Sequence, residues 1–211
     1  MTIKRDARRE AIIATARDAF LRNGFADTSM SHIAATLGGS KTTLWSYFPN
    51  KADLFIAVAD DLVQEYIVWI NGTLEEAQCL QTSLQHYGTQ LIAALSSPQI
   101  DTLIRIVSGE AKRMPQLGEL FHERGLGRGW LMLKAFFDGA VERGQIRGDC
   151  DTLVAAQHFM GLCKAGAYQR FMLGGSTAPD SAAIAADVRA ATDIFLRAYA
   201  VAEARVPDPA D

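Results

Sequence analysis

Hydrophobic residues recur three and four positions apart along almost the whole chain, and no stretch alternates between polar and apolar residues. This spacing is typical of amphipathic helices, whereas half-buried strands would alternate. Ile12, Ala16 and Phe20 form the first stripe, and Asn23 and Gly24 predict where that helix ends, since both residues tolerate a left-handed backbone. The sequence therefore predicts an all-α fold.

Two short helices are predicted next, separated by the sequence LGGS at residues 37–40. Thr28 or Ser29 can cap the first of them, because a side-chain oxygen there accepts a hydrogen bond from a backbone N–H of the first turn. Ser40 can cap the second, and Pro49 ends it because proline lacks an N–H and restricts the residue before it. Two short helices joined in this way form a helix-turn-helix motif.

The second short helix has a composition that suits burial on one side and solvent on the other. Leu44 and Phe48 lie four positions apart and are expected to point into the scaffold. The hydroxyl, amine and aromatic side chains then form an outer face that can meet phosphates and base edges, unless it is only a solvated surface. The candidate DNA-binding residues are Thr28, Ser29, Ser40, Lys41, Thr42, Thr43, Trp45, Ser46, Tyr47 and Lys51.

Longer helices follow the motif. Asn50 and Asp53 predict the start of a helix that reaches about residue 72, and Pro98 and Pro115 predict two helix starts because proline suits the first turn. Further helices are predicted from Leu80 to Leu95, over residues 126–144 and 151–173, and along Ile184, Val188, Ala191, Phe195 and Ala198. The segment 151–173 is apolar on nearly all sides, which predicts burial on more than one face. We expect a DNA-binding domain at residues 1–52 and a helical body at residues 53–205.

Charge is distributed unevenly along the 211-residue chain, although the net charge is only −3. Residues 1–51 hold eight Lys and Arg against four Asp and Glu, whereas the rest holds 13 against 20. A basic head on an acidic body favours contact between the head and a polyanion, with chance as the alternative. Arg5, Arg8 and Arg9 form either an arm that follows phosphates or the minor groove, or only solvated charge.

Other classes of protein find little support. No apolar run is long enough to span a membrane and the N-terminus lacks an apolar signal core, so we expect a cytoplasmic protein. Cys79, Cys150 and Cys163 match neither a disulfide framework nor a zinc spacing, and we expect no metal and no cofactor. The glycines of residues 125–130 follow no strand, and no nucleophile motif is present. We therefore expect no catalytic residues and no enzyme activity.

The segment AFLRNGFADTSMSHIAATLGGSKTTLWSYFPNKADLF, residues 19–55, carries the most specific pattern. It resembles the DNA-binding head of the TetR family of transcriptional regulators. The agreeing positions are Gly24, Phe25, Thr28, Ser29, Ile33, Ala34, Gly38, Ser40, Thr43, Leu44, Trp45, Tyr47, Phe48, Lys51 and Leu54. Trp45 replaces the tyrosine usual in the family, which removes a hydroxyl but leaves an indole N–H donor, and Gly39 replaces a small aliphatic residue.

Two segments of the body, RIVSGEAKRMPQLGELFHERG at 105–125 and AVERGQIRGDCDTLVAAQHFMGL at 140–162, are similar to the C-terminal domain of the AefR-like branch of that family. The resemblance implies a homodimer in which the last two long helices of each subunit form a four-helix interface. The composition agrees, because small residues let helices approach and phenylalanines interdigitate. These residues are Ala155, Ala156, Gly161, Ala165, Gly166 and Ala167, the alanines of 182–202, and Phe159, Phe171 and Phe195.

An effector pocket in the body is expected to be mostly apolar, with few polar groups. The candidate lining residues are Tyr66, Trp69, Met114, Phe121, Trp130 and Phe137, for each of which plain core packing is the alternative. No strongly charged cluster appears among the middle helices, which favours a small hydrophobic effector. We expect a repressor that leaves a palindromic DNA operator when this effector binds. The alternatives are an activator, a regulator controlled by a protein partner, and a helical scaffold or enzyme whose head does not bind DNA specifically.

Overall fold

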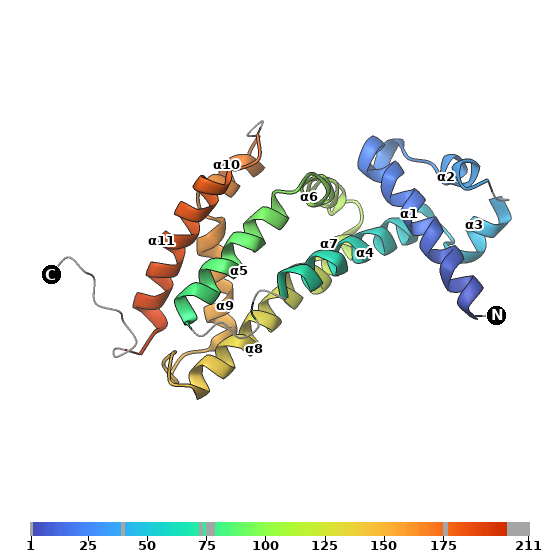
Figure 1. The fold of residues 1–211 in the computed structure, drawn as a ribbon. Helices are drawn as coiled ribbons and strands as arrows, with labels where there is room; N and C mark the ends of the chain where they lie inside the picture. The colour runs from blue at the N-terminus through green and yellow to red at the C-terminus, as the bar shows by residue number, and fades with distance from the viewer. Residues whose placement is uncertain (1, 39–40, 72–73, 75–78, 175–176, 202–211) are drawn as a thin grey trace. The chain divides into compact units, whose positions relative to one another are not determined.

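The computed structural model describes residues 2–38, 41–71, 74, 79–174 and 177–201. Within these residues the chain is helical, with one isolated antiparallel bridge between Ile146 and Ala200, and the predicted all-α fold is confirmed (Figure 1). No helix of this described part is long and apolar enough to cross a membrane. The helices are α1 (Thr2–Asp27), α2 (Met30–Thr36), α3 (Lys41–Tyr47), α4 (Lys51–Asn71), α5 (Leu80–Leu95), α6 (Pro98–Glu110), α7 (Pro115–Phe121), the π-helix η1 (His122–Gly127), α8 (Arg128–Glu142), α9 (Thr152–Lys164), α10 (Ala167–Met172) and α11 (Ser181–Tyr199).

The chain packs as two compact units. The first contains Met1–Glu65 and Pro98–Gly125, and the second contains Tyr66–Ser97 and Leu126–Asp211. Helix α4 starts in the first unit and ends in the second, so one continuous helix belongs to both. This division describes packing, and the expected functional boundary between residues 52 and 53 stays a prediction.

Three aromatic rings join α1 to α4 in the first unit. The Phe20 and Phe55 rings meet edge to face with centroids 5.0 Å apart, and the Phe25 ring lies 5.2 Å from that of Phe55. Phe25 can reach this cluster because the backbone leaves the helical conformation at Gly24, with φ 77° and ψ 175°. The sequence predicted the end of the first regular helix at this position, and the structure confirms it.

The predicted start of α4 is also confirmed. The Asp53 N–H donates to the Asn50 side-chain oxygen at 2.8 Å, and the Asn50 amide donates to the Asp53 carboxylate at 2.9 Å. These two bonds satisfy groups that would otherwise lack partners in the first turn of the helix. Pro98 and Pro115 begin α6 and α7, as their preference for a first turn predicts.

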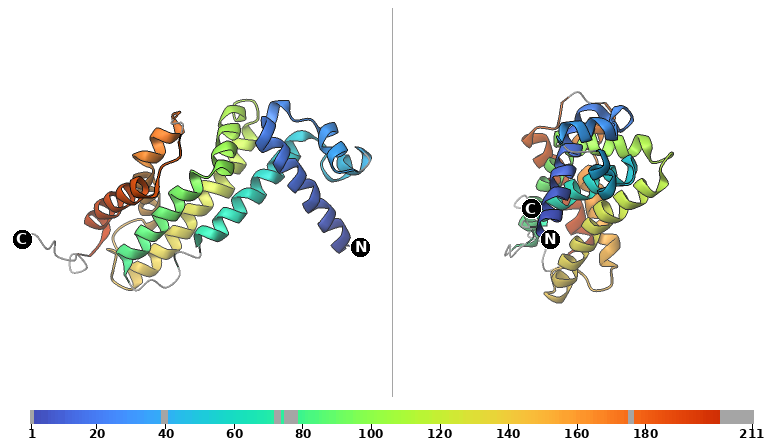
Figure 2. Two further views of the ribbon diagram at one scale, coloured as in Figure 1. Left: turned by 45° about the horizontal axis from the view of Figure 1, so that its top comes forward. Right: turned by 90° about the vertical axis from the view of Figure 1, so that its right-hand side faces the viewer.

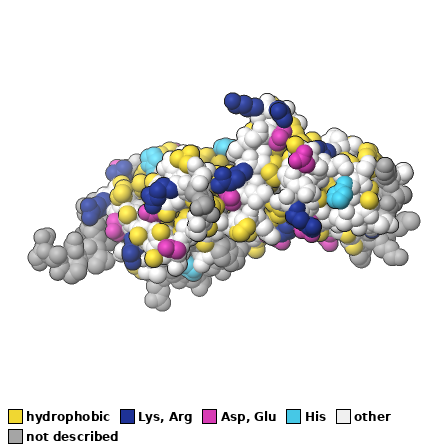
Figure 3. Space-filling view, turned by 90° about the horizontal axis from the view of Figure 1, so that it is seen from above, with side chains coloured by type: hydrophobic (Ala, Val, Ile, Leu, Met, Phe, Trp, Pro, Cys, Tyr) yellow, Lys and Arg dark blue, Asp and Glu magenta, His cyan; other side chains and the backbone are white. Residues whose placement is uncertain are grey.

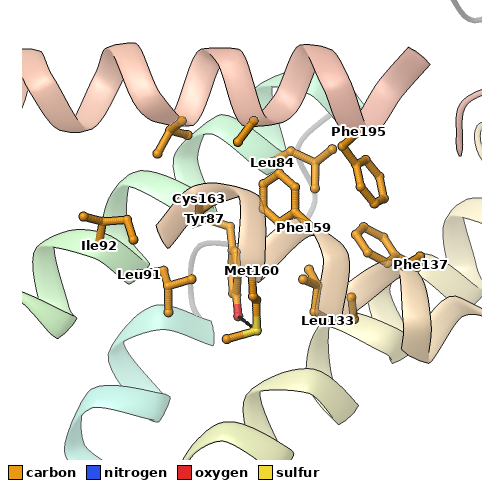
Figure 4. Close-up of a cluster of buried hydrophobic side chains, with 14 of the residues drawn as sticks. Leu84, Tyr87, Leu91, Ile92, Leu133, Phe137, Phe159, Met160, Cys163 and Phe195 are labelled. Carbon is orange, nitrogen blue, oxygen red and sulfur yellow. Dashed lines mark hydrogen bonds between the residues drawn. The ribbon is translucent and has the colours of Figure 1, made fainter. Parts of the chain in front are cut away.

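The core of the second unit lies between α5, α8, α9 and α11 (Figures 2 and 4). The Phe195 ring of α11 stacks on Phe137 of α8 at 4.9 Å and meets the edge of Phe159 of α9 at 5.3 Å. All three side chains are fully buried. Burial of one such side chain contributes about 1.5–3 kcal/mol, so this contact joins three helices strongly.

The segment predicted as one helix over residues 151–173 is instead two helices, α9 and α10. Its burial on several faces is confirmed, since α9 packs against α5, α8 and α11. The break lies at Gly166, whose φ of 132° excludes helical geometry, and the Ala167 N–H donates to the Asp187 carboxylate of α11 at 2.7 Å. A contact with a distant helix therefore ends α9, and local periodicity does not show it.

The segment predicted as one helix over residues 126–144 also differs from the prediction. Helix α8 begins at Arg128 and follows directly on the π-helix η1, whose wider turns the spacing of apolar residues did not indicate. Its end agrees with the prediction, because Gly144 has a φ of 69° and its N–H donates to the Val141 carbonyl at 2.9 Å.

Candidate nucleic-acid interface

Helix α2 is capped by one member of the predicted pair of hydroxyl residues. Ser29 has an extended backbone and accepts a hydrogen bond from the His32 N–H at 3.1 Å. Thr28 is 2% exposed, and its hydroxyl donates to the carbonyls of Gly24 at 2.7 Å and Ala19 at 3.2 Å. The Thr28 hydroxyl therefore connects the residue before α2 to the carbonyls of α1, and a contact of this buried residue with DNA stays a prediction. Ser29 remains exposed.

Helix α3 is oriented as its composition predicted. Leu44 and Phe48 are 2% and 4% exposed and hold the helix against the rest of the head. Thr42, Trp45 and Ser46 are exposed on the other side, with Trp45 at 39%. Thr43 and Tyr47 lie half-buried at the edge between the two faces. The outer face of α3, by which we mean Thr42, Trp45, Ser46 and the accessible parts of Thr43 and Tyr47, is therefore open to a partner.

Two expected DNA contacts lie wholly or partly outside the described residues. Ser40 is one of the undescribed positions before α3. Lys41 begins α3 by its backbone, but its side chain also lies outside the described part. Both residues remain predictions.

Lys51 has a partner within the protein, which the sequence did not indicate. Its ammonium donates to the Phe25 carbonyl at 2.7 Å and to the Ala26 carbonyl at 3.1 Å. It also lies 4.4 Å from the centroid of the Phe25 ring. Lys51 therefore satisfies carbonyls after Gly24 and holds α4 against the end of α1. The ammonium has a third donor, and the expected phosphate contact of Lys51 stays a prediction.

Acidic side chains of α4 connect it to two other elements of the first unit. Arg17 of α1 binds Glu65 at 2.5 Å and Asp61 at 3.5 Å, and Arg124 of η1 binds Asp60 at 3.1 Å. No local pattern in the sequence indicates these ion pairs, because the partners lie far apart in the chain. On the face that Figure 3 shows, Lys and Arg side chains lie between acidic and hydrophobic ones and form no continuous patch.

The expected effector residues divide between the two units. Tyr66 and Trp130 are half-buried and pack against the core cluster of the second unit, and the Tyr66 hydroxyl accepts a hydrogen bond from Ser97 at 3.0 Å. Phe137 is fully buried in that core. Met114 and Phe121 are half-buried in the first unit, and the side chain of Trp69 lies outside the described residues. A role in binding an effector stays a prediction for these residues.

The second unit carries an open pocket of about 280 Å³ whose lining includes none of the expected effector residues. Burial lowers the pKa of the Lys164 amine beside it. Among the described residues, no group of three or more His, Cys, Asp or Glu side chains is placed to hold a metal ion. The pocket is lined by Gly161, Lys164, Ala165, Tyr168, Gln169 and Met172.

Helices α9 and α11 pack together and leave adjoining outer faces exposed. Ala155, Ala156, Phe159 and Phe195, expected to serve a dimer interface, are instead buried within the subunit. Eight exposed positions at helical spacing, which we call the α9–α11 face, are small or apolar with one histidine, and the exposed Asp193 and Arg197 border them. The eight positions are Val154, His158 and Gly161 on α9, Ala165 directly after it, and Ala186, Ala190, Ile194 and Ala198 on α11.

Two family models match the chain. The model described as "Bacterial regulatory proteins, tetR family" matches residues 12–58, which include α2, α3 and the start of α4. The model described as "AefR-like transcriptional repressor, C-terminal domain" matches residues 82–201, which is more than half of the chain.

Solved structures and curated proteins agree with these matches. A TetR-family regulator from Mesorhizobium loti is 31% identical with a TM-score of 0.86, over 93% of this chain and 99% of that one. The flavonoid-responsive regulator FrrA is 25% identical with a TM-score of 0.77, over 93% and 99%. The HTH-type transcriptional regulator RutR of Escherichia coli is 29% identical over 113 residues, 53% of each chain, so the match spans about half the length of RutR.

Proposed function

We infer the function of this chain from its family, because it belongs to the TetR family of bacterial transcriptional regulators and carries an AefR-like C-terminal domain. We propose that it is a repressor, which occupies a palindromic operator as a homodimer and leaves it when a small hydrophobic effector binds the body. The outer face of α3 carries this proposal, since Thr42, Trp45 and Ser46 are exposed while Leu44 and Phe48 are buried.

The outer face of α3 has the chemistry that the major groove requires. Threonine and serine hydroxyls donate to or accept from base edges and phosphates, and a threonine methyl group contacts the methyl group of thymine. The Trp45 indole N–H is a donor only, so it suits a phosphate oxygen. Leu44 and Phe48 fix these groups on a rigid scaffold, which limits the entropy lost on binding.

Dimerisation is proposed through the α9–α11 face. Its alanines and Gly161 allow close approach of helices from a second copy, and Ile194, which is 53% exposed, supplies apolar area. Two heads held by such a body would contact half-sites about 34 Å apart along one face of the DNA. A two-fold symmetric protein then requires a palindromic operator.

The effector is proposed to be a small, mostly apolar compound. Half-buried aromatic side chains such as Tyr66 and Trp130 offer contact area with few charges, and the similar protein FrrA is described as flavonoid-responsive. An effector that favours a different spacing of the two heads by about 1–3 kcal/mol would weaken operator binding roughly 5- to 150-fold.

Selection of bound duplexes from a random DNA library tests the proposal, followed by a footprint on the recovered sequence. A repressor dimer is expected to recover a palindrome and to protect two patches about one helical turn apart. Transcription from a promoter that overlaps the site should fall when the protein is added. Recovery of no common sequence, or activation of that promoter, would contradict the proposed role.

A further inference from the structure

Two arginines of α1 lie against aromatic rings at the end of α3. The Arg5 guanidinium carbon is 5.9 Å from the centroid of the Tyr47 ring, and that of Arg9 is 5.4 Å from the centroid of the Phe48 ring. Arg5 and Arg9 are one helical turn apart, so both project from the same face of α1. This face therefore adjoins the outer face of α3, to which Tyr47 belongs.

The contact with a ring leaves the hydrogen-bonding groups of both arginines unused. A guanidinium has five N–H donors, which lie in its plane, whereas its attraction to an aromatic ring uses neither a donor nor an acceptor. Phe48 has no polar side-chain atom, and both arginines are exposed. Each ring thus restricts a guanidinium while its donors stay available.

Charge pairing differs along α1. Arg17 is paired with Asp61 and Glu65, and Arg22 is paired with Asp18. Among the described residues, no carboxylate lies within salt-bridge distance of Arg5 or Arg9. Like charges one helical turn apart repel each other, and a neighbouring anion would relieve that repulsion. Residues 5–10 hold three arginines against Asp6 and Glu10, so the turns of α1 beside α3 keep a net charge of +1, and no ion pair within the described part of the chain holds Arg5 or Arg9.

We propose that Arg5 and Arg9 bind phosphodiester oxygens of double-stranded DNA beside the groove that α3 enters, with the rings of Tyr47 and Phe48 holding the two guanidinium groups in place. This inference rests on the proposed function, and it adds to α3 a second DNA contact from another helix. Phosphate contacts carry no sequence information. The arginines therefore increase affinity for all DNA and leave the choice of sequence to α3.

The test is the salt dependence of DNA binding for the full chain and the Arg5→Ala/Arg9→Ala double variant. Each lost phosphate contact lowers the slope of log K against log salt by about 0.9. Because a dimer carries two copies of each arginine, the double variant lacks four contacts and is expected to lose about 3.6 in slope. It should also bind selected and unrelated duplexes more weakly by the same factor, and melt as the wild type does. The matched control is Arg22→Ala, because Arg22 is exposed on the same helix and paired with Asp18. It is expected to keep the wild-type slope.

Two further variants test the role of the rings. Arg5→Lys/Arg9→Lys keeps the charge and should restore most of the slope, while binding stays weaker because lysine lacks the planar donor group. Phe48→Leu keeps an apolar side chain but removes the ring under Arg9, and it should weaken binding with little change of slope. A selective wild type whose Arg5→Ala/Arg9→Ala variant keeps the slope of the Arg22→Ala control would overturn this inference alone. Absence of selective binding by the wild type would overturn the proposed function as well.

Discussion

Gly88 of α5 and Val188 of α11 lie so close that only glycine fits at position 88. A Cβ built on Gly88 would be 2.8 Å from Val188 Cγ1 and 3.0 Å from the sulfur of Cys163. Both distances are well inside van der Waals contact, and both neighbours are buried, so neither side chain can turn away into solvent. One missing side chain therefore sets how closely α5 packs against α9 and α11.

Gly88→Ala is expected to destabilise the protein by about 1–3 kcal/mol through overpacking, against a gain of about 1 kcal/mol in helix propensity. Chemical denaturation followed by circular dichroism measures the change. Gly109→Ala is the matched control, because a Cβ on Gly109 of α6 meets nothing within 4 Å. Val188→Ala should relieve the clash with a Cβ at position 88. The Gly88→Ala/Val188→Ala variant should therefore lose less free energy of unfolding than the two single variants lose together. Equal effects at positions 88 and 109 would contradict the packing described.

Lys51→Met should destabilise the first unit by about 1–3 kcal/mol, since two carbonyls lose a charged donor and Phe25 loses its cation. Methionine keeps most of the apolar stem, so the change isolates the ammonium. Urea denaturation provides the measurement. Lys112→Met, at an exposed lysine, should change stability by less than about 0.5 kcal/mol. If Lys51→Met were as stable as Lys112→Met, the Lys51 ammonium would not hold α4 against the end of α1. It would then be free to serve as the phosphate contact that the sequence suggested.

The three cysteines should differ in reactivity in the folded protein. Cys79 is exposed, and hydrogen bonding from the Thr82 backbone lowers its pKa, whereas burial raises the pKa of Cys163 to about 12. Because the thiolate is the reactive form, alkylation near pH 8 should modify Cys79 first and Cys163 only after unfolding. The rate at Cys79 should rise with pH and level off above its lowered pKa. Mass spectrometry of timed iodoacetamide reactions identifies the order, and early modification of Cys163 would contradict its burial.

Ile194→Asp should convert the proposed dimer to a monomer, because it places a charge on the α9–α11 face. Sedimentation equilibrium measures the mass, and the monomer should bind DNA far more weakly because it has one head in place of two. Val68→Asp is the control, since Val68 is 69% exposed on α4 and lies outside that face. A dimer that survives Ile194→Asp with unchanged affinity would place the interface elsewhere.

The sequence predicted those features that depend on neighbours along the chain. Gly24, Asn50 with Asp53, and Pro98 define helix ends because their own backbone or side-chain chemistry acts within one turn. The spacing of Leu44 and Phe48 likewise predicted the orientation of α3, because a helix repeats every 3.6 residues.

The features that the sequence did not predict depend on contacts between distant residues. The break at Gly166 involves the Asp187 carboxylate of another helix, and the carbonyls that bind Lys51 belong to the end of α1. Thr28 was expected on the surface with Ser29, but the fold turns its hydroxyl toward the carbonyl of Ala19. The division of small residues on α9 between core and surface also follows only from the packing of α5, α8 and α11 around it.

The most direct test of the account compares binding of a selected operator and a scrambled duplex by the wild type and by Thr42→Ala/Trp45→Ala. Both residues are exposed on α3, so the variant should melt as the wild type does, whereas Leu44→Ala should lose about 2–5 kcal/mol of stability. We expect the wild type to prefer the operator by roughly a thousandfold or more, and the double variant to lose most of that preference. A double variant that folds normally and discriminates as well as the wild type would contradict the claim that the outer face of α3 reads DNA.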